Sequence, residues 1–283
     1  MLAFVHIKKT AGTTLTAILR RNFGTRHLDT RLHLYEDLFL ADDLRRALKL
    51  YRRLDCIAGH HVRPFGDLHS LIPKIRYFTF VREPISRLVS DFQFKLSCLT
   101  RRGIQPRDTM ELFHTWLKGQ RNLQVRSLAG CEDSDEAIRT IRQQIGFVGQ
   151  AERFDDSLVM WRRWTQNADL DLRYRSLNKS SSSQAKNKYF LREQMDSSEQ
   201  LRKIVQEANL EDLKLYRWVR DELFPRQIEE YGEQILATET DELRRANQEL
   251  HAWRADSVAG RIFRNLLYRP LKPLLGVGRT RAA

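Results

Sequence analysis

The sequence has 283 residues, 41% of them apolar, which is ordinary for a globular protein and long enough for one large domain. No stretch approaches the roughly 18 consecutive apolar residues of a membrane-spanning helix, and the N-terminus lacks the pattern of a secretory signal, so we expect a cytoplasmic protein. Lysine and arginine outnumber aspartate and glutamate by 49 to 36, and the net charge of +13 favours an anionic partner.

Short strands alternate with helices along most of the chain. Aromatic and β-branched runs predict strands at residues 2–7, 54–58, 76–81, 145–149 and 170–174. Helical spacing of apolar residues predicts helices that start near residues 14 and 83 and others within 108–145, 153–166, 193–206 and 210–223. The alternation predicts an α/β fold, with a parallel sheet flanked by helices. A change of composition near residue 238 predicts a domain at 1–237 and a basic helical extension at 238–283.

The turn between the first strand and the first helix has the features of a phosphate-binding loop. It reads His-Ile-Lys-Lys-Thr-Ala-Gly-Thr-Thr-Leu from residue 6 to residue 15. N–H groups at the start of a helix, together with the helix dipole, favour an anion. Gly12 lets the backbone approach the anion, Lys9 supplies a cation, and the two threonines after Gly12 offer hydroxyl donors. The GxxxxGKS/T nucleotide pattern is absent, so an ordinary turn with a surface lysine is the alternative.

A second strand-to-helix junction carries an arginine at its start. Arg82 ends the strand predicted at 76–81, and the carboxyl ends of strands are where open α/β sheets bind ligands. Its planar guanidinium suits a bidentate contact with phosphate. Ser90 lies about two turns along the following helix, which Pro84 opens. The alternative is a helix N-terminus with a solvated basic face.

Two histidines are candidates for a general base. His60 and His61 follow Gly59 at the end of the strand predicted at 54–58. Histidine can accept the proton of a reacting hydroxyl because its pKa lies near neutrality. Either histidine could do so, and a structural histidine that caps a loop is the alternative.

Together these segments resemble the Golgi-type carbohydrate sulfotransferases, whose relatives include the heparan sulfate 2-O- and 6-O-sulfotransferases and many bacterial proteins. The first segment is similar to the family's 5′-phosphosulfate loop, HIPKTAGTT, with Lys8 in place of proline. The second is similar to the family's 3′-phosphate motif, RxPxxRxxS. The resemblance spans about residues 3–224 and implies a P-loop-like fold that binds 3′-phosphoadenylyl sulfate (PAPS). The implied donor-binding residues are Lys9, Thr10, Ala11, Gly12, Thr13, Thr14, Arg82 and Ser90.

The resemblance also implies roles on the catalytic and acceptor side. The family's catalytic histidine directly follows a glycine, which matches His60, and the loop lysine, Lys9, assists it. The second histidine, His61, then becomes an acceptor contact. The motif NxQxRxL near the family's acceptor matches Gln124 and Arg126, for which a polar helix face is the alternative.

Another stretch, Asn-Lys-Ser-Ser from residue 178, resembles a family loop that closes over the nucleotide. The residues of this loop that would contact the donor are Lys179 and Ser180.

The resemblance implies an enzyme that moves a sulfuryl group from PAPS to a hydroxyl, on a carbohydrate, by in-line displacement with a histidine base and no metal. The alternatives are a kinase-like phosphotransferase and a non-catalytic nucleotide- or glycan-binding protein on the same fold. The three cysteines are scattered without a CxxC pair, which indicates reduced thiols rather than a zinc site. No nucleic-acid partner is expected, because zinc-finger spacing, an aromatic RNA-binding signature and a basic zipper are all missing.

The C-terminal tail combines basic and apolar residues. Residues 257–283 contain six arginines and lysines and no acidic residue, and Ile262, Phe263, Leu266 and Leu267 are interleaved with them. A basic amphipathic helix of this kind can lie on an anionic membrane, which would place the protein at the inner face of the membrane. A helix packed on the domain, or a frayed tail, is the alternative.

Overall fold

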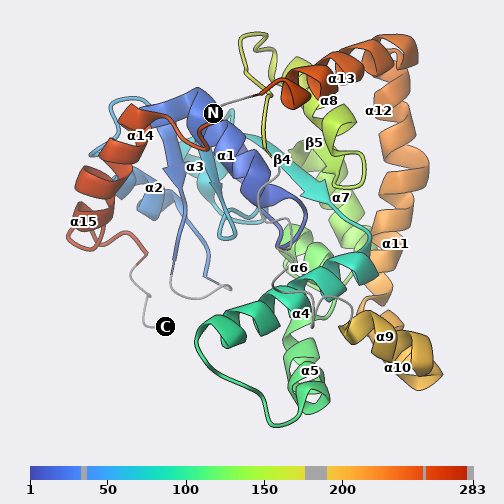
Figure 1. The fold of residues 1–283 in the computed structure, drawn as a ribbon. Helices are drawn as coiled ribbons and strands as arrows, with labels where there is room; N and C mark the ends of the chain where they lie inside the picture. The colour runs from blue at the N-terminus through green and yellow to red at the C-terminus, as the bar shows by residue number, and fades with distance from the viewer. Residues whose placement is uncertain (33–36, 176–189, 251–252, 279–283) are drawn as a thin grey trace.

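A five-stranded parallel sheet forms the centre of the molecule (Figure 1). The computed structural model describes residues 1–32, 37–175, 190–250 and 253–278. The strand order is β2-β3-β1-β4-β5, and every neighbouring pair is parallel. The strands are β1 (Leu2–Val5), β2 (His27–Asp29), β3 (Cys56–Gly59), β4 (Arg76–Val81) and β5 (Ile145–Gln150). This sheet confirms the predicted α/β fold.

Helices surround the sheet and extend beyond it. The longer ones are α1 (Gly12–Phe23), α4 (Pro84–Arg101), α5 (Thr109–Leu117), α7 (Ser134–Gln144), α8 (Phe154–Thr165), α9 (Phe190–Ser197), α10 (Glu199–Ala208), α11 (Leu210–Trp218), α12 (Phe224–Tyr231) and α13 (Glu233–Gln248). The shorter ones are η1 (Gly24–Arg26), α2 (Ala41–Ala47), α3 (Leu68–Leu71), η2 (Lys118–Gln120), α6 (Leu123–Ala129), η4 (Val219–Leu223), α14 (Val258–Ile262), η5 (Phe263–Tyr268) and α15 (Arg269–Leu271). The predicted boundary between residues 237 and 238 falls inside α13.

Two strands differ from the expectation. The strand predicted at 170–174 does not form, because the backbone there bonds to α1 instead of a neighbouring strand. The N–H of Asp171 donates to the Asn22 side chain, and the Asp171 carbonyl accepts from the same amide. β2 was not predicted, since a run of three residues is too short to show an alternating pattern.

Side chains that alternate along each strand supply two separate cores. On one face, Ala3 and Val5 pack in a cluster with residues of α2, α6, α7 and α11. On the other face, Leu2 and Phe4 pack with residues of α1, α8, α12 and α13. A third cluster lies away from the sheet and joins α4, α5, α9 and α10. Figure 1 shows this third group below the sheet, beside the loops that follow the strands.

The C-terminal segment, residues 253–278, packs on the domain. Tyr268 and Val277 belong to the same core as β1 and β3. In Figure 1, α14 and α15 lie beside α2, on the opposite side of the molecule from α12. Within the described part of the chain, no helix has both the length and the apolar character needed to span a bilayer.

We expect Phe78→Ala to lower the free energy of unfolding by about 3–5 kcal/mol, the usual effect of removing a buried aromatic ring. The Phe78 ring is fully buried on β4, 5.1 Å from the Phe4 ring and 5.3 Å from the Trp161 ring, measured between centroids. Urea unfolding measures the change. Leu210→Ala is the control, because Leu210 is 52% exposed and its truncation should change stability by less than about 0.5 kcal/mol. Equal effects of the two substitutions would contradict this account of the core.

Candidate active site

The three loops singled out in the sequence meet at one edge of the sheet. β3, β1 and β4 are neighbours and run parallel, so the residues that follow them leave the sheet at the same end. Two hydrogen bonds join the loops there. The His60 ring contacts the His6 carbonyl at 2.6 Å, and the Arg82 guanidinium donates to the Lys9 carbonyl at 3.1 Å. The structure therefore brings Lys9, His60 and Arg82 together.

The loop between β1 and α1 has an unusual backbone. Lys9 and Ala11 have φ angles of 66° and 63°, in the left-handed region that costs a non-glycine residue about 1–2 kcal/mol. The buried Thr10 hydroxyl donates to the Ile7 carbonyl at 3.0 Å, which holds the turn from inside. Strained backbone of this kind is concentrated at ligand clamps and active sites. The loop leads directly into α1, and the N–H groups of the first turn of a helix are the ones that can bind an anion.

The packing of His6 requires a glycine at position 12, a role that the loop motif did not predict for His6. A Cβ atom at Gly12 would lie 2.0 Å from the His6 ring. That ring also stacks on the Phe4 ring at 5.3 Å and lies 4.1 Å from the His60 ring, between centroids. The sequence does contain a signal for this position. Side chains alternate along a strand, so His6 lies on the same face as Leu2 and Phe4, the face that α1 covers.

Lys9 leans on α4. Its ammonium nitrogen lies 4.6 Å from the centre of the Phe94 ring, a cation–π contact. Burial lowers the pKa of Lys9, and the nearby Asp91 carboxylate partly offsets that effect. Ser90 is half-buried on the same helix, next to Asp91. The side chains of α4 that interact with Lys9, Phe94 and Asp91, thus lie just beyond the second predicted motif.

The His60 ring is held in one tautomer. The His6 carbonyl can only accept, so the bond between them places the ring proton on Nδ1 and leaves Nε2 unprotonated. Burial lowers the pKa of His60 to about 4, while the bond to the His6 carbonyl opposes this shift. The neighbouring cations Lys8 and Arg63 lower it further. At neutral pH the ring is therefore uncharged and able to accept a proton at Nε2.

His61 turns toward a different part of the chain. Its ring lies 3.1 Å from the Asp37 carbonyl, and its own carbonyl accepts the N–H of Phe39 at 2.9 Å. The side chain is buried, and burial lowers its pKa. These contacts tie the loop after β3 to residues 37–39, so His61 supports the loop that carries His60.

Arg82 is fixed by a buried amide. Gln124, at the start of α6, accepts the Arg82 N–H at 2.9 Å and donates to the Arg82 carbonyl at 2.8 Å. Asp212 on α11 in turn accepts the backbone N–H groups of Gln124 and Val125. Gln124 is fully buried, so its place in the structure is behind Arg82 rather than in contact with an acceptor. Asp212 is a supporting residue that lies too far along the chain for a local motif to reveal.

α4 begins directly after Arg82 and carries the rest of the second motif. The Glu83 carboxylate accepts the N–H groups of Ile85 and Ser86 and so caps the helix. Arg87 is fully buried with its guanidinium 3.6 Å from the Asp91 carboxylate, and its three side-chain nitrogens make no hydrogen bond with the residues that the structure describes. A buried cation of this kind adds to the positive potential around Arg82.

A cavity of about 250 Å³ lies beside this edge. Arg63, three residues after His60, and Arg126 on α6 both line it, as does the Phe65 ring. Arg126 is thus the member of the predicted acceptor motif that faces open space. The remaining lining residues are Leu38, Leu123, Ser127 and Gly130. Lys179 and Ser180 lie outside the described residues.

Comparison with known families agrees with this arrangement. A model of the sulfotransferase family matches residues 1–219, a span that contains all three loops and the strands that carry them. The chain belongs to the sulfotransferase family. No curated protein matches it. Family membership makes the protein a transferase of sulfuryl groups, as the loop motifs predicted.

We expect Gly12→Ala to destabilise this sulfotransferase by about 1–3 kcal/mol, because the added methyl group would overlap the His6 ring. Urea unfolding measures the effect. The same substitution in a His6→Ala background should cost much less, since the overlapping ring is gone. Gly119→Ala is the matched control, because a Cβ at Gly119 meets nothing within 4 Å. An equal cost of Gly12→Ala with and without the His6 ring would contradict the assigned overlap.

Proposed function

We propose that this sulfotransferase moves the sulfuryl group of PAPS to a hydroxyl of a carbohydrate, with His60 as the base. The observation that carries the proposal is the meeting of the Lys9 loop, His60 and Arg82 at one edge of the sheet. A neutral histidine, a strained anion-binding loop and a fixed arginine form a set that a simple binding protein does not need. The donor and the acceptor would be held on opposite sides of His60.

The residues on the donor side suit PAPS, which carries a 5′-phosphosulfate and a 3′-phosphate and supplies an activated sulfuryl group. Lys9 and the N–H groups at the start of α1 would hold the 5′-phosphosulfate. Arg82, with Ser90 on α4, would hold the 3′-phosphate. The fit is supported by the left-handed backbone at Lys9 and Ala11 and by the buried, positively charged Arg87. A donor that lacks the 3′-phosphate would lose the Arg82 contact, which gives selectivity against ATP-like nucleotides.

His60 would remove the proton from the acceptor. As the hydroxyl oxygen forms its bond to sulfur, the bond from sulfur to the bridging phosphate oxygen breaks, and the hydroxyl proton passes to Nε2 of His60. The negative charge that grows on the bridging oxygen would be stabilised by Lys9, with Thr13 and Thr14 as hydroxyl donors. Cations and N–H groups already in position are the usual source of rate in such a transfer. The low pKa of His60 keeps the ring ready to accept a proton across the neutral range.

The cavity lined by Arg63, Phe65 and Arg126 is the proposed acceptor site. Sugar rings pack on aromatic side chains and bond to guanidinium groups, and this cavity offers both. Phe65 is 41% exposed, and its ring covers Gly130, where a Cβ would lie 3.3 Å away. Arg63 also acts electrostatically on His60, which supports a short distance between this cavity and the base.

We expect wild-type protein to bind 3′,5′-adenosine bisphosphate, the spent donor, and Arg82→Ala to bind it about tenfold to a hundredfold more weakly, the worth of a hydrogen bond to a charged group. Isothermal calorimetry measures both affinities. Arg52→Ala, an exposed arginine away from the site, is the control and should bind as the wild type does. The absence of binding by folded wild-type protein would remove PAPS as the donor.

We expect His60→Ala to lower kcat by about 10²–10⁴-fold while leaving adenosine bisphosphate binding intact, because it removes only the base. Transfer of labelled sulfate from PAPS to a panel of desulfated glycans measures the rate. Near-normal turnover by the variant would exclude His60 as the base.

The pH profile offers a separate test of the same residue. The folded pKa of His60 is lowered to about 4, so the base is unprotonated above that pH and protonated below it. We therefore expect the acidic limb of kcat/KM for the wild type to lie near that pH, well below the ordinary histidine value of about 6.5. An acidic limb near the ordinary value would show that another group is the base.

A further inference from the structure

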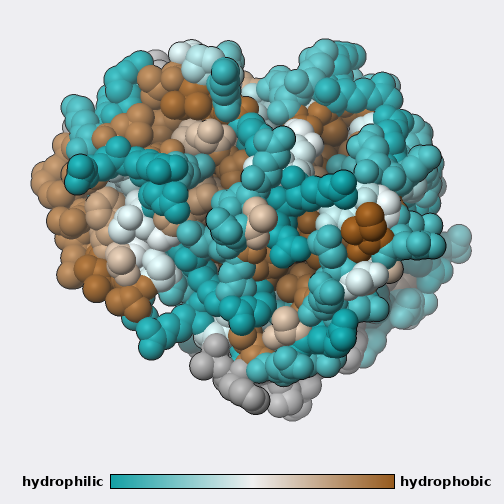
Figure 2. Space-filling view, turned by 90° about the horizontal axis from the view of Figure 1, so that it is seen from above, coloured by the Kyte–Doolittle hydropathy of each residue, from teal (hydrophilic) through white to brown (hydrophobic). Residues whose placement is uncertain are grey.

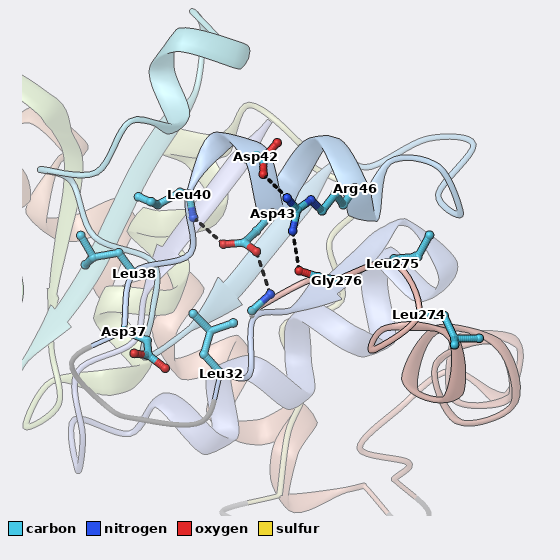
Figure 3. Close-up of a pocket in the computed structure, with 11 residues that line it drawn as sticks. Leu32, Asp37, Leu38, Leu40, Asp42, Asp43, Arg46, Leu274, Leu275 and Gly276 are labelled. Carbon is cyan, nitrogen blue, oxygen red and sulfur yellow. Dashed lines mark hydrogen bonds and ion pairs between the residues drawn. The ribbon is translucent and has the colours of Figure 1, made fainter. Parts of the chain in front are cut away.

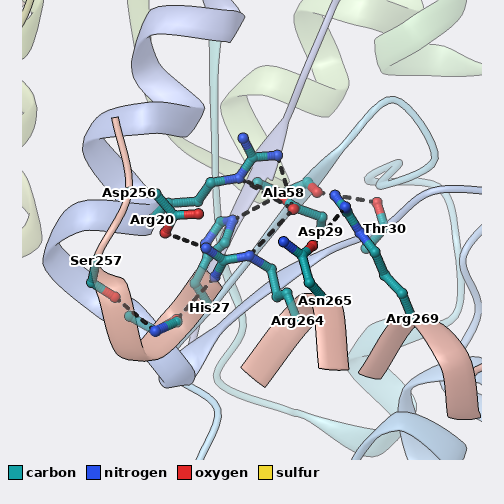
Figure 4. Close-up of polar contacts among 12 residues, drawn as sticks. Arg20, His27, Asp29, Thr30, Ala58, Asp256, Ser257, Arg264, Asn265 and Arg269 are labelled. Atoms are coloured by element: carbon teal, nitrogen blue, oxygen red, sulfur yellow. Dashed lines mark hydrogen bonds and ion pairs between the residues drawn. The ribbon is translucent and has the colours of Figure 1, made fainter. Parts of the chain in front are cut away.

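A buried arginine, Arg264, attaches the inner face of the C-terminal segment to the domain. Arg264, in η5, is 3% exposed and pairs with Asp256 (Figure 4). Its guanidinium also donates to the Gly24 carbonyl at 3.2 Å and lies 3.8 Å from the Asp29 carboxylate. Asp29 is bonded in turn to Arg20 on α1. The segment therefore has one fixed orientation on the domain.

Apolar and backbone contacts on both sides of Arg264 fix that orientation further. The rings of Phe263 and Tyr268 pack on Tyr51, with centroids 4.9 and 5.4 Å away. At the far end, Arg46 donates to the Gly276 carbonyl at 2.6 Å, and the N–H of Gly278 donates to Asp43 at 2.7 Å. Figure 3 shows the contact between Arg46 and Gly276 at a cavity of about 550 Å³ between α2 and residues 274–278.

The outer face of the same segment is apolar, which is the reverse of an ordinary surface helix. Leu266 is 70% exposed and Leu274 is 80% exposed. Further large apolar side chains exposed on the segment are Val258, Ile262 and Leu267. Figure 2 shows hydrophobic residues gathered along the left side of the molecule, where Figure 1 places α14 and α15. Contiguous apolar surface of this kind marks an interaction site.

Positive charge borders the apolar face. Arg261 and Arg269 are exposed on it, and residues 257–283 contain no aspartate or glutamate. Acidic side chains that contact the segment are already engaged: Asp256 pairs with Arg264, and Asp43 accepts the N–H of Gly278. Exposed leucines beside exposed arginines complement a surface that is apolar beneath and negatively charged above.

We propose that the outer face of α14, η5 and α15 docks on an anionic lipid bilayer. Leucine side chains would enter the boundary of the acyl chains while the arginines meet phosphate headgroups. A second copy of the chain fits this face less well, because a two-fold contact would bring Arg261 and Arg269 of both copies into one interface. The net charge of +13 opposes such an association further. The proposal is independent of the donor and acceptor assignments.

Sedimentation of full-length protein with lipid vesicles tests the proposal. We expect binding to vesicles of phosphatidylcholine mixed with phosphatidylglycerol and none to phosphatidylcholine alone. Leu266→Asp combined with Leu267→Asp should lower partitioning about tenfold or more, because the charges cannot enter the acyl boundary. Arg261→Gln combined with Arg269→Gln should lower it about fivefold or more, near the worth of one basic residue at an anionic surface.

Ile235→Asp is the matched control, because Ile235 is an apolar residue of α13 that is 52% exposed away from the segment. It should bind vesicles as the wild type does, and circular dichroism should show all variants folded. Binding of the leucine variant equal to the wild type would overturn the proposal. So would the absence of vesicle binding by the wild type, or a wild-type dimer in light scattering that the leucine variant converts to monomer.

Discussion

The His6 ring links the loop at residues 6–15 to His60, and the geometry of the candidate site depends on the packing of this ring. The ring lies against Gly12 on one side and near the His60 ring on another, while the His6 carbonyl accepts a hydrogen bond from Nδ1 of His60. One residue thus sets the position of the first turn of α1 and the tautomer of His60. Because the half-buried His6 ring lies between Gly12 and the His60 ring, a shift of the loop that moves His6 would also move the His60 ring.

A second constraint acts on the other side of Lys9. The Arg82 guanidinium holds the Lys9 carbonyl, and Gln124 holds the main chain of Arg82. The main chain at Lys9 is therefore held by Arg82, which Gln124 in turn fixes to the core. This support offsets the left-handed backbone of the loop, which would relax if the chain were free.

The sequence predicts the elements whose signals are local and misses those that depend on distant contacts. Long aromatic strands such as β4 and the loop at residues 6–15 were predicted because alternation and helix starts are visible within a few residues. β2 is too short to alternate, and residues 170–174 look like a strand although α1 takes their hydrogen bonds. Gln124 was predicted as an acceptor contact, but its bonds to the Arg82 main chain depend on the packing of α6 against α11, which no spacing in the chain encodes. The same packing places Asp212 behind Gln124.

The contact between Arg264 and Asp29 also has a consequence for solubility. Asp29 ends β2, which is the outermost strand of the sheet in the part of the chain that the structure describes. Open edges pair readily with other chains, and proteins protect them with short strands, charges or a covering segment. β2 is three residues long, and the C-terminal segment is anchored at its end. A chain that lost this segment would expose both the edge strand and the apolar core beneath it, and so would be prone to aggregate through that edge.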